Sequence, residues 1–171
     1  VGGYGFCSCG ALQNIRLPAS VTSIGDHAFA YCSKLESVNI PEGVQKIERY
    51  TFNSCAALTQ INIPNSVTEI GEFSFQDSGL TALTLPENLT SIGDYAFSGC
   101  SMTSITLPET LTTIEDGAFS SCGRLSSITI PAKTVNIGNY VFHNCPKLST
   151  MSQIRGYELY SHARHAGLSP C

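Results

Sequence analysis

Charged side chains are scarce in this sequence of 171 residues, because Asp, Glu, Lys and Arg together make up 13% of it. That is about half the usual share for a soluble domain. Nine basic and thirteen acidic residues give a net charge of −4, so no basic field exists to attract nucleic acid. The sequence also lacks any run of 18 apolar residues, which excludes a membrane-spanning helix. We therefore expect neither nucleic-acid binding nor a membrane span.

Motifs for catalysis and cofactor binding are missing as well. His162 and His165 form a pair, but no third ligand is evident and no Glu completes a metalloprotease arrangement. His143 lies near Cys145, yet this Cys occupies a packing position, whereas a nucleophile needs an exposed and activated thiolate. No phosphate-cradling glycine loop is present. We therefore predict a protein that is not an enzyme and needs no cofactor or metal.

What the sequence does contain is a repeated phrase, clearest from Leu85 to Cys100. Its Phe recurs every 22 or 23 residues, at Phe6, Phe29, Phe52, Phe75, Phe97, Phe119 and Phe142. A Pro recurs with the same period from Pro18 to Pro131. Self-similarity at a fixed period of about 20 to 50 residues predicts a stack of repeated units that share one core.

Each repeat is interpreted as a strand, a corner, an extended run and a helical turn. Leu125 to Ile130 ends in an apolar–polar alternation that predicts a short strand, and the Pro after it ends the strand. Leu89 to Ile92 has room for a second short strand or an extended run. Asp94 is then expected to act as the N-cap of a single helical turn over 95–98.

Six of the eight Cys residues stand three positions after a repeat Phe: Cys9, Cys32, Cys55, Cys100, Cys122 and Cys145. One Cys per repeat at a fixed phase predicts a packing position, where buried free Cys behaves as a small hydrophobe. Disulfides between these positions are disfavoured because stacked side chains point in parallel. Cys7 and Cys171 fall outside this register and are the predicted reactive thiols.

The pattern Leu-x-x-Ile-x-Ile-Pro-x-x-Val-x-x-Ile-Gly-x-x-Ala-Phe-x-x-Cys resembles the BspA-like, or Treponema-type, leucine-rich repeat. The resemblance implies a right-handed coil with short parallel strands and one helical turn per repeat of about 23 residues. It covers residues 1–150 in about six to seven repeats. Residues 151–171 are predicted to form a C-terminal cap, with a short helix indicated by the spacing of Leu159, Ala163 and Ala166.

Two columns of residues are candidate binding surfaces. The first lies between the paired apolar residues of each strand and comprises Arg16, Asn39, Asn62, Thr84, Thr106 and Thr129. The second lies two residues before each Phe and includes Tyr50 and Tyr95, which would stack as part of an aromatic ladder. For the ladder, structural packing is the favoured interpretation. For the first column, a solvated sheet face is an equally good interpretation, and this column is the better candidate of the two. The outward-facing residues of the Val-x-x-Ile run, such as Gln45 and Thr68, are as good candidates for the binding surface as the first column.

The resemblance implies a non-enzymatic protein-binding module of a cell-surface or secreted, adhesin-like protein. Its expected partner is a protein ligand, such as an extracellular-matrix or host surface protein. The sequence begins within a repeat without a signal peptide, so we expect a monomeric fragment of a longer chain. The alternative is a rigid spacer or stalk that displays another domain of a larger surface protein.

Overall fold

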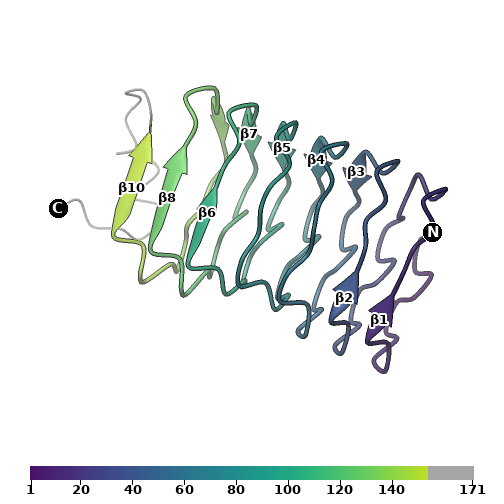
Figure 1. Cartoon of the computed structure of the whole chain (residues 1–171). Helices are drawn as coiled ribbons and strands as arrows, with labels where there is room; N and C mark the ends of the chain where they lie inside the picture. The colour runs from purple at the N-terminus through teal and green to yellow at the C-terminus, as the bar shows by residue number, and fades with distance from the viewer. Residues whose placement is uncertain (154–171) are drawn as a thin grey trace.

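In this computed structural model, residues 1–153 are described, and they form a parallel β-solenoid whose turns stack along one axis (Figure 1). All strand pairs in this part of the chain are parallel. The strands are β1 (Asn14–Ile15), β2 (Ser37–Val38), β3 (Lys46–Ile47), β4 (Glu69–Ile70), β5 (Ser91–Ile92), β6 (Ser104–Thr106), β7 (Thr113–Ile114), β8 (Ser127–Ile130), β9 (Asn136–Ile137) and β10 (Thr150–Gln153). The predicted solenoid of short parallel strands is confirmed.

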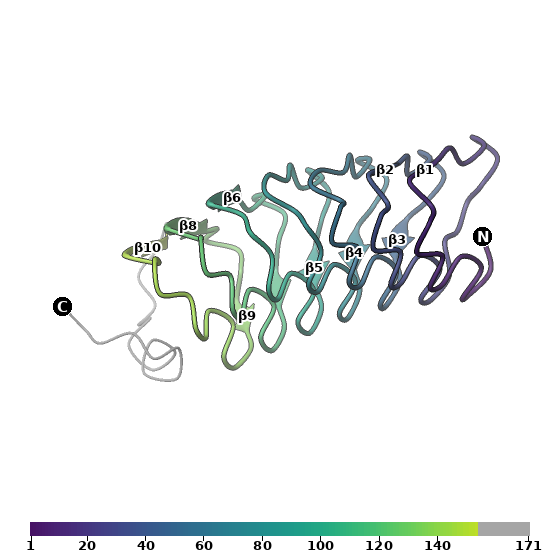
Figure 2. The same cartoon turned by 90° about the horizontal axis from the view of Figure 1, so that it is seen from below.

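The Val-x-x-Ile runs form one continuous sheet in the order β3-β4-β5-β7-β9. Its register places the Ile of each run opposite the Ile of the next, as in Ile70 opposite Ile92. The Ile residues from Ile47 to Ile114 are buried and Ile137 is half-buried, while the residue before each Ile is more exposed. Figure 2 shows these strands along one side of the stack and β1, β2, β6, β8 and β10 along another.

The second side is interrupted, because its strands form a pair, β1-β2, and a separate sheet, β10-β8-β6. The segments 60–63 and 82–85 lie between these sheets in sequence and make no backbone hydrogen bond to a neighbouring turn within residues 1–153. Apolar side chains that are buried, or half-buried at Leu83, still alternate along both segments. Packing, rather than a hydrogen-bonded ladder, therefore holds the centre of this side.

A column of seven stacked Phe rings fills the core along the solenoid axis. Consecutive ring centroids, from Phe6 to Phe142, lie 5.2–5.9 Å apart with nearly parallel planes. Five of these rings are fully buried. Offset stacking of this kind adds about 0.5–1.5 kcal/mol per pair beyond the burial of apolar area, so the period of the Phe residues sets the alignment of the turns.

The segment around each Phe is not the predicted helical turn. In the repeat of Phe97, both Tyr95 (φ 52°) and Gly99 (φ 74°) are left-handed, whereas a right-handed helix needs negative φ throughout. The same two positions are left-handed in every repeat from Tyr4 to Asn144. At these residues the backbone changes direction, and every second N–H group points along the solenoid axis. Each segment is therefore a run of tight turns.

Those N–H groups form a third ladder between turns. For each pair of neighbouring turns, three backbone N–H groups of the earlier turn donate to carbonyls of the later one at 2.7–3.1 Å. In the repeat of Phe29, for example, His27 donates to Arg49, Phe29 to Thr51 and Tyr31 to Asn53. The left-handed residues thus give the solenoid a hydrogen-bonded side made of turns instead of strands.

The carboxylate of Asp94 does not cap its own turn as predicted. Its Oδ1 accepts the backbone N–H of Asp116 in the next repeat at 2.9 Å. Asp116 Oδ1 in turn accepts the N–H of Asn139 at 2.6 Å. These side chains connect neighbouring turns because the segment that follows them is not a helix and offers no orphan N–H groups of its own.

The predicted packing role of the Cys column holds for its five later members, which are free and buried. Each thiol donates to the carbonyl of the Phe one turn earlier, at 3.0–3.2 Å. Cys9, in the first described turn, differs because it is exposed. The column therefore combines apolar packing with a hydrogen bond between turns.

Strand pairing extends beyond the predicted array boundary at residue 150. β10 pairs with β8 in register, from Thr150 opposite Ser127 to Gln153 opposite Ile130. The predicted cap helix, together with His162, His165 and Cys171, lies outside the described residues.

Candidate functional site

The first candidate column lies on the interrupted side of the solenoid, and all six of its side chains are exposed. Thr106 and Thr129 stand opposite each other in β6 and β8. Arg16 and Asn39 directly follow β1 and β2. Asn62 and Thr84 occupy the two segments without a backbone ladder. The column therefore contributes one exposed residue per turn on this side, and its role as a binding surface stays a prediction.

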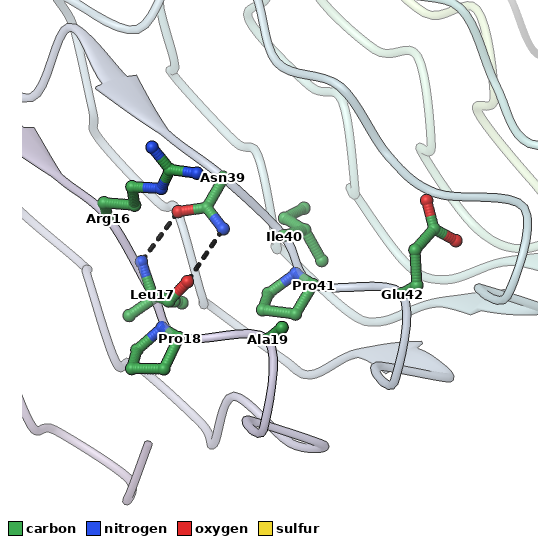
Figure 3. A pocket seen from close by; sticks show the side chains of 8 residues that line it. All are labelled: Arg16, Leu17, Pro18, Ala19, Asn39, Ile40, Pro41 and Glu42. Atoms are coloured by element: carbon green, nitrogen blue, oxygen red, sulfur yellow. Dashed lines mark hydrogen bonds between the residues drawn. The ribbon is translucent and has the colours of Figure 1, made fainter.

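Asn39 has a structural role that the sequence did not reveal. Its Oδ1 accepts the backbone N–H of Leu17 at 2.7 Å, and its Nδ2 donates to the carbonyl of Leu17 at 3.0 Å (Figure 3). The side-chain amide thereby replaces a strand pairing just beyond the end of β1 and β2. Because both the oxygen and the nitrogen of this amide bond to Leu17, the Asn39 side chain is held in place and has little hydrogen-bonding capacity left for a ligand.

A pocket of about 580 Å³ lies beside Asn39, at the corners of the first two turns. It is lined by Arg16, Leu17, Pro18, Ala19, Asn39, Ile40, Pro41 and Glu42. Figure 3 shows Arg16 and Glu42 on opposite sides of an apolar centre. Two predicted binding residues, Arg16 and Asn39, therefore line a concave surface rather than a flat one.

Tyr50 and Tyr95 lie in a different column, on the side built from turns. Their rings belong to an outer ladder in which Tyr4, His27, Tyr50, Phe73 and Tyr95 stack at centroid distances of 4.5–5.2 Å. Burial raises the pKa of the Tyr50 hydroxyl, and Glu72 raises it further. Because neighbouring rings cover each other's faces, this geometry supports packing over ligand binding.

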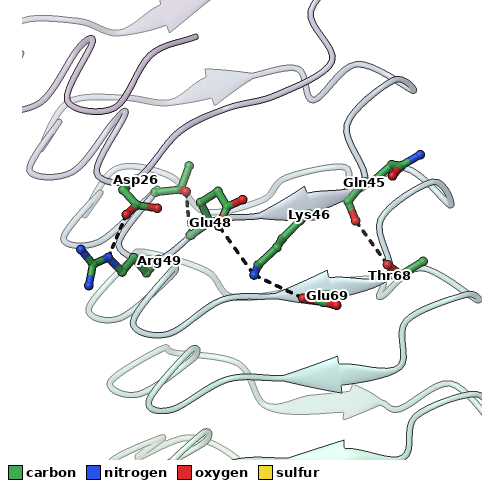
Figure 4. Close-up of polar contacts among 8 residues, drawn as sticks. Asp26, Gln45, Lys46, Glu48, Arg49, Thr68 and Glu69 are labelled. Carbon is green, nitrogen blue, oxygen red and sulfur yellow. Dashed lines mark hydrogen bonds and ion pairs between the residues drawn. The ribbon is translucent and has the colours of Figure 1, made fainter.

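The competing columns on the continuous sheet are tied to the fold by their own side chains (Figure 4). Lys46 Nζ lies 3.3 Å from Glu69 and 3.7 Å from Glu48, and the hydrogen bond that Lys46 donates to Glu69 raises the pKa of Lys46. The hydroxyls of Thr90 and Thr112 each donate to a carbonyl of the preceding turn, at 3.0 and 3.1 Å. These side chains have less free hydrogen-bonding capacity than Asn62, Thr84 and Thr106, whose side chains make no such bond within residues 1–153.

The buried thiols are poor nucleophiles and poor metal ligands. Burial raises the pKa of Cys55 and of Cys100 to about 12, so both stay protonated at neutral pH. Among residues 1–153, no three His, Cys, Asp or Glu side chains are grouped so that they could hold a metal ion. The same part of the chain contains no helix that could cross a membrane.

The sequence profile of the BspA type leucine rich repeat region matches this chain in six copies, over residues 1–91 and 68–161. The chain belongs to this family. A search of curated protein sequences finds no match for this BspA-type array.

Solved structures of bacterial leucine-rich repeat proteins share the fold. The Treponema pallidum leucine rich repeat protein is 30% identical, with a TM-score of 0.80 over 99% of this chain and 77% of its own. A leucine-rich repeat protein from Bacteroides ovatus is 33% identical, with a TM-score of 0.69 over 84% of this chain and 44% of its own. A leucine rich cell surface protein from Faecalibacterium prausnitzii is 27% identical, with a TM-score of 0.70 over 94% and 52%. The BspA-type array thus spans about half the length of two of these proteins.

Together these features give the BspA-type array a shared repeating core and an exposed polar column on the interrupted side. The pocket and the ladder of turns escaped sequence reasoning because both arise between repeats. A signal for the turns was nevertheless present two residues after each Phe, where Ser54, Asp77, Gly99 and Asn144 are typical turn residues.

Proposed function

We propose that this BspA-type array is a non-enzymatic protein-binding module of a cell-surface or secreted protein. The observation that carries the proposal is the exposed column on the interrupted side, which offers one variable residue per turn at a fixed register position. Solenoids use such extended surfaces for recognition because a long, rigid face costs little ordering on binding.

The chemistry of the column favours a protein ligand. Its members are Arg, Asn and Thr side chains, which offer neutral hydrogen-bonding groups and one fixed positive charge. A likeness to a leucine rich cell surface protein supports placing this chain at the cell surface or outside the cell. On that basis we propose extracellular-matrix or host surface proteins as the class of ligand.

The test is a binding assay of the whole chain against an immobilised panel of collagen, laminin and fibronectin. We expect saturable binding that is lost when Asn62, Thr84 and Thr106 are all changed to Arg. These three positions are chosen because their side chains form no hydrogen bond within residues 1–153, so the change should leave the fold intact. Asn39 is avoided because its amide is needed by Leu17.

A matched control places three Arg residues on the continuous sheet, at Gln45, Ser91 and Val135. Binding that survives in this control but not in the first variant supports the proposed face. Loss of binding in the control variant alone would indicate that the binding surface lies on the continuous sheet. No saturable binding by the parent chain would instead favour a rigid spacer, a role that the stacked Phe column and the three ladders would also serve.

A further inference from the structure

Within residues 1–153, side chains tie the proline corners of successive turns together at each junction from the corner at Pro41 to the corner at Pro131. Ser66 Oγ donates to the Val44 carbonyl at 2.8 Å, and Asn88 Nδ2 to the Asn65 carbonyl at 2.9 Å. Thr110 Oγ1 reaches the Glu87 carbonyl at 2.6 Å. Thr134 Oγ1 reaches the Leu111 carbonyl at 2.8 Å. Each tie draws one corner against the next.

The first junction differs because Gly43 stands where Ser66, Asn88 and Thr110 stand in later turns. Without a side chain at this position, no side-chain hydrogen bond joins the corners 18–21 and 41–44 in the part of the chain that the structure describes. This junction is also where the pocket lies. Its residue Pro18 is exposed, whereas Pro41 on the other side of the pocket is buried.

The pocket combines an apolar centre with two opposite charges, Arg16 and Glu42, that form no ion pair within the described residues. Within residues 1–153 the ion pairs involve Lys46, Arg49 and their acidic neighbours, and include neither Arg16 nor Glu42. Figure 3 shows these two side chains on either side of the centre. The volume of about 580 Å³ falls within the range of pockets that hold small ligands.

The wall of the pocket is held in place before any ligand arrives. Both hydrogen-bonding groups of the Asn39 amide are fixed on Leu17, and Leu17, Ile40 and Pro41 are buried. A preorganised wall lowers the ordering cost of binding. A ligand would therefore meet a rigid apolar surface with a guanidinium on one side and a carboxylate on the other.

We propose that this pocket binds a short segment of a partner protein in which an acidic, an aliphatic and a basic residue follow one another. The acidic side chain pairs with Arg16, whose planar guanidinium suits a carboxylate. The aliphatic side chain packs on Pro18, Ala19 and Pro41, and the basic side chain pairs with Glu42. This assignment rests on the proposed protein-binding function and names the chemistry of one contact within it.

The test uses fluorescein-labelled peptides and fluorescence anisotropy with the whole chain. The probe is Gly-Asp-Leu-Lys-Gly with both ends blocked, and the comparison peptide is Gly-Lys-Leu-Lys-Gly. We expect the Asp-Leu-Lys peptide to bind saturably and at least about fivefold more tightly than the Lys-Leu-Lys peptide, since one exposed ion pair is exchanged for a repulsion.

Charge reversal at Arg16 gives the sharper prediction. The Arg16→Glu variant should prefer the Lys-Leu-Lys peptide, whereas the control Glu87→Lys, at a corner that is already tied, should keep the original preference. A parent chain that shows no saturable binding of the Asp-Leu-Lys peptide, or a preference unaffected by Arg16→Glu, overturns the proposal. If the matrix-protein panel still binds in that case, the pocket assignment fails alone; if neither binds, the proposed function fails with it.

Discussion

The ring of Tyr95 occupies the space that a side chain at Gly117 would need. A Cβ placed on Gly117 would overlap Cδ1, Cε1 and Cζ of this ring. Gly117 stands where the other repeats carry a ring of the outer ladder, and its φ of 62° is the left-handed value that they share. The ladder therefore ends with the Tyr95 ring lying over a residue that has no side chain.

We predict that Gly117→Ala lowers the free energy of unfolding by about 1–3 kcal/mol, because the Tyr95 ring must move and the left-handed backbone becomes less favourable. Urea denaturation followed by circular dichroism measures this loss. Gly123→Ala is the matched control, since a Cβ at Gly123 has no neighbour within 4 Å. A loss that remains unchanged in a Tyr95→Ala background would show that the ring is not the cause.

Ile92→Asp should abolish cooperative unfolding. Ile92 is fully buried in the continuous sheet, and an unpaired carboxylate there costs several kcal/mol, which is comparable to the whole stability of a domain. Thermal melting followed by circular dichroism gives the answer. The control is Ser91→Asp, one residue earlier on the outward side, which should melt cooperatively; a normal melt of Ile92→Asp would contradict the assigned core.

Alkylation should separate the thiols of the folded protein into two classes. Cys7 and Cys9 are accessible, whereas Cys55, Cys100 and Cys122 are fully or almost fully buried and donate to Phe carbonyls. We expect iodoacetamide to label Cys7 and Cys9 in native buffer and to label the buried thiols only in denaturant. Peptide mapping by mass spectrometry measures the labelling, and rapid labelling of Cys55 without denaturant would refute the packing role of this column.

Stability should fall with rising pH in a window set by the buried thiols. Burial raises the pKa of Cys55 from its usual 9.0 to about 12. Below pH 9 the thiol is protonated in both the folded and the unfolded states, so it adds no pH dependence. Between pH 9 and 12 only the unfolded state releases the proton, and the free energy of unfolding falls by up to about 1.4 kcal/mol per pH unit for one such thiol.

Urea titrations from about pH 8 to about pH 11 test this slope against Cys55→Ala. The variant should show a shallower decline than the parent chain. Val44→Ala serves as the control, because it also creates a cavity in the buried core but removes no titrating group. Equal slopes for the parent and Cys55→Ala would show that this thiol does not contribute.

Much of the architecture could be predicted because the core positions repeat with a fixed period. Ile70 and Ile92 could be placed opposite each other from their spacing to Phe75 and Phe97, and the structure pairs them. The prediction of a helical turn was wrong because an aromatic residue such as Tyr50 rarely adopts a left-handed backbone unless other contacts stabilise it. Here three hydrogen bonds to the next turn and a stacked ring favour that conformation, and neither can be deduced from one repeat considered by itself.

The candidate site was predictable only as a list of outward positions. The alternation of apolar and polar residues correctly predicted that Thr106 and Thr129 are exposed. The same pattern could not reveal that Asn39 bonds to Leu17, because that contact depends on where the β1-β2 ladder stops. Nor could it identify the pocket, which forms between the corners of two neighbouring turns.

The ladder of turns also gives the solenoid a direction. Every one of its bonds runs from an N–H of the earlier turn to a carbonyl of the later one. Along this side, each turn therefore presents its hydrogen-bond donors toward the following turn and its acceptors toward the preceding turn. Two copies meeting by identical ends would oppose like groups, so any further turn, or any second chain, could extend this ladder only in a head-to-tail sense.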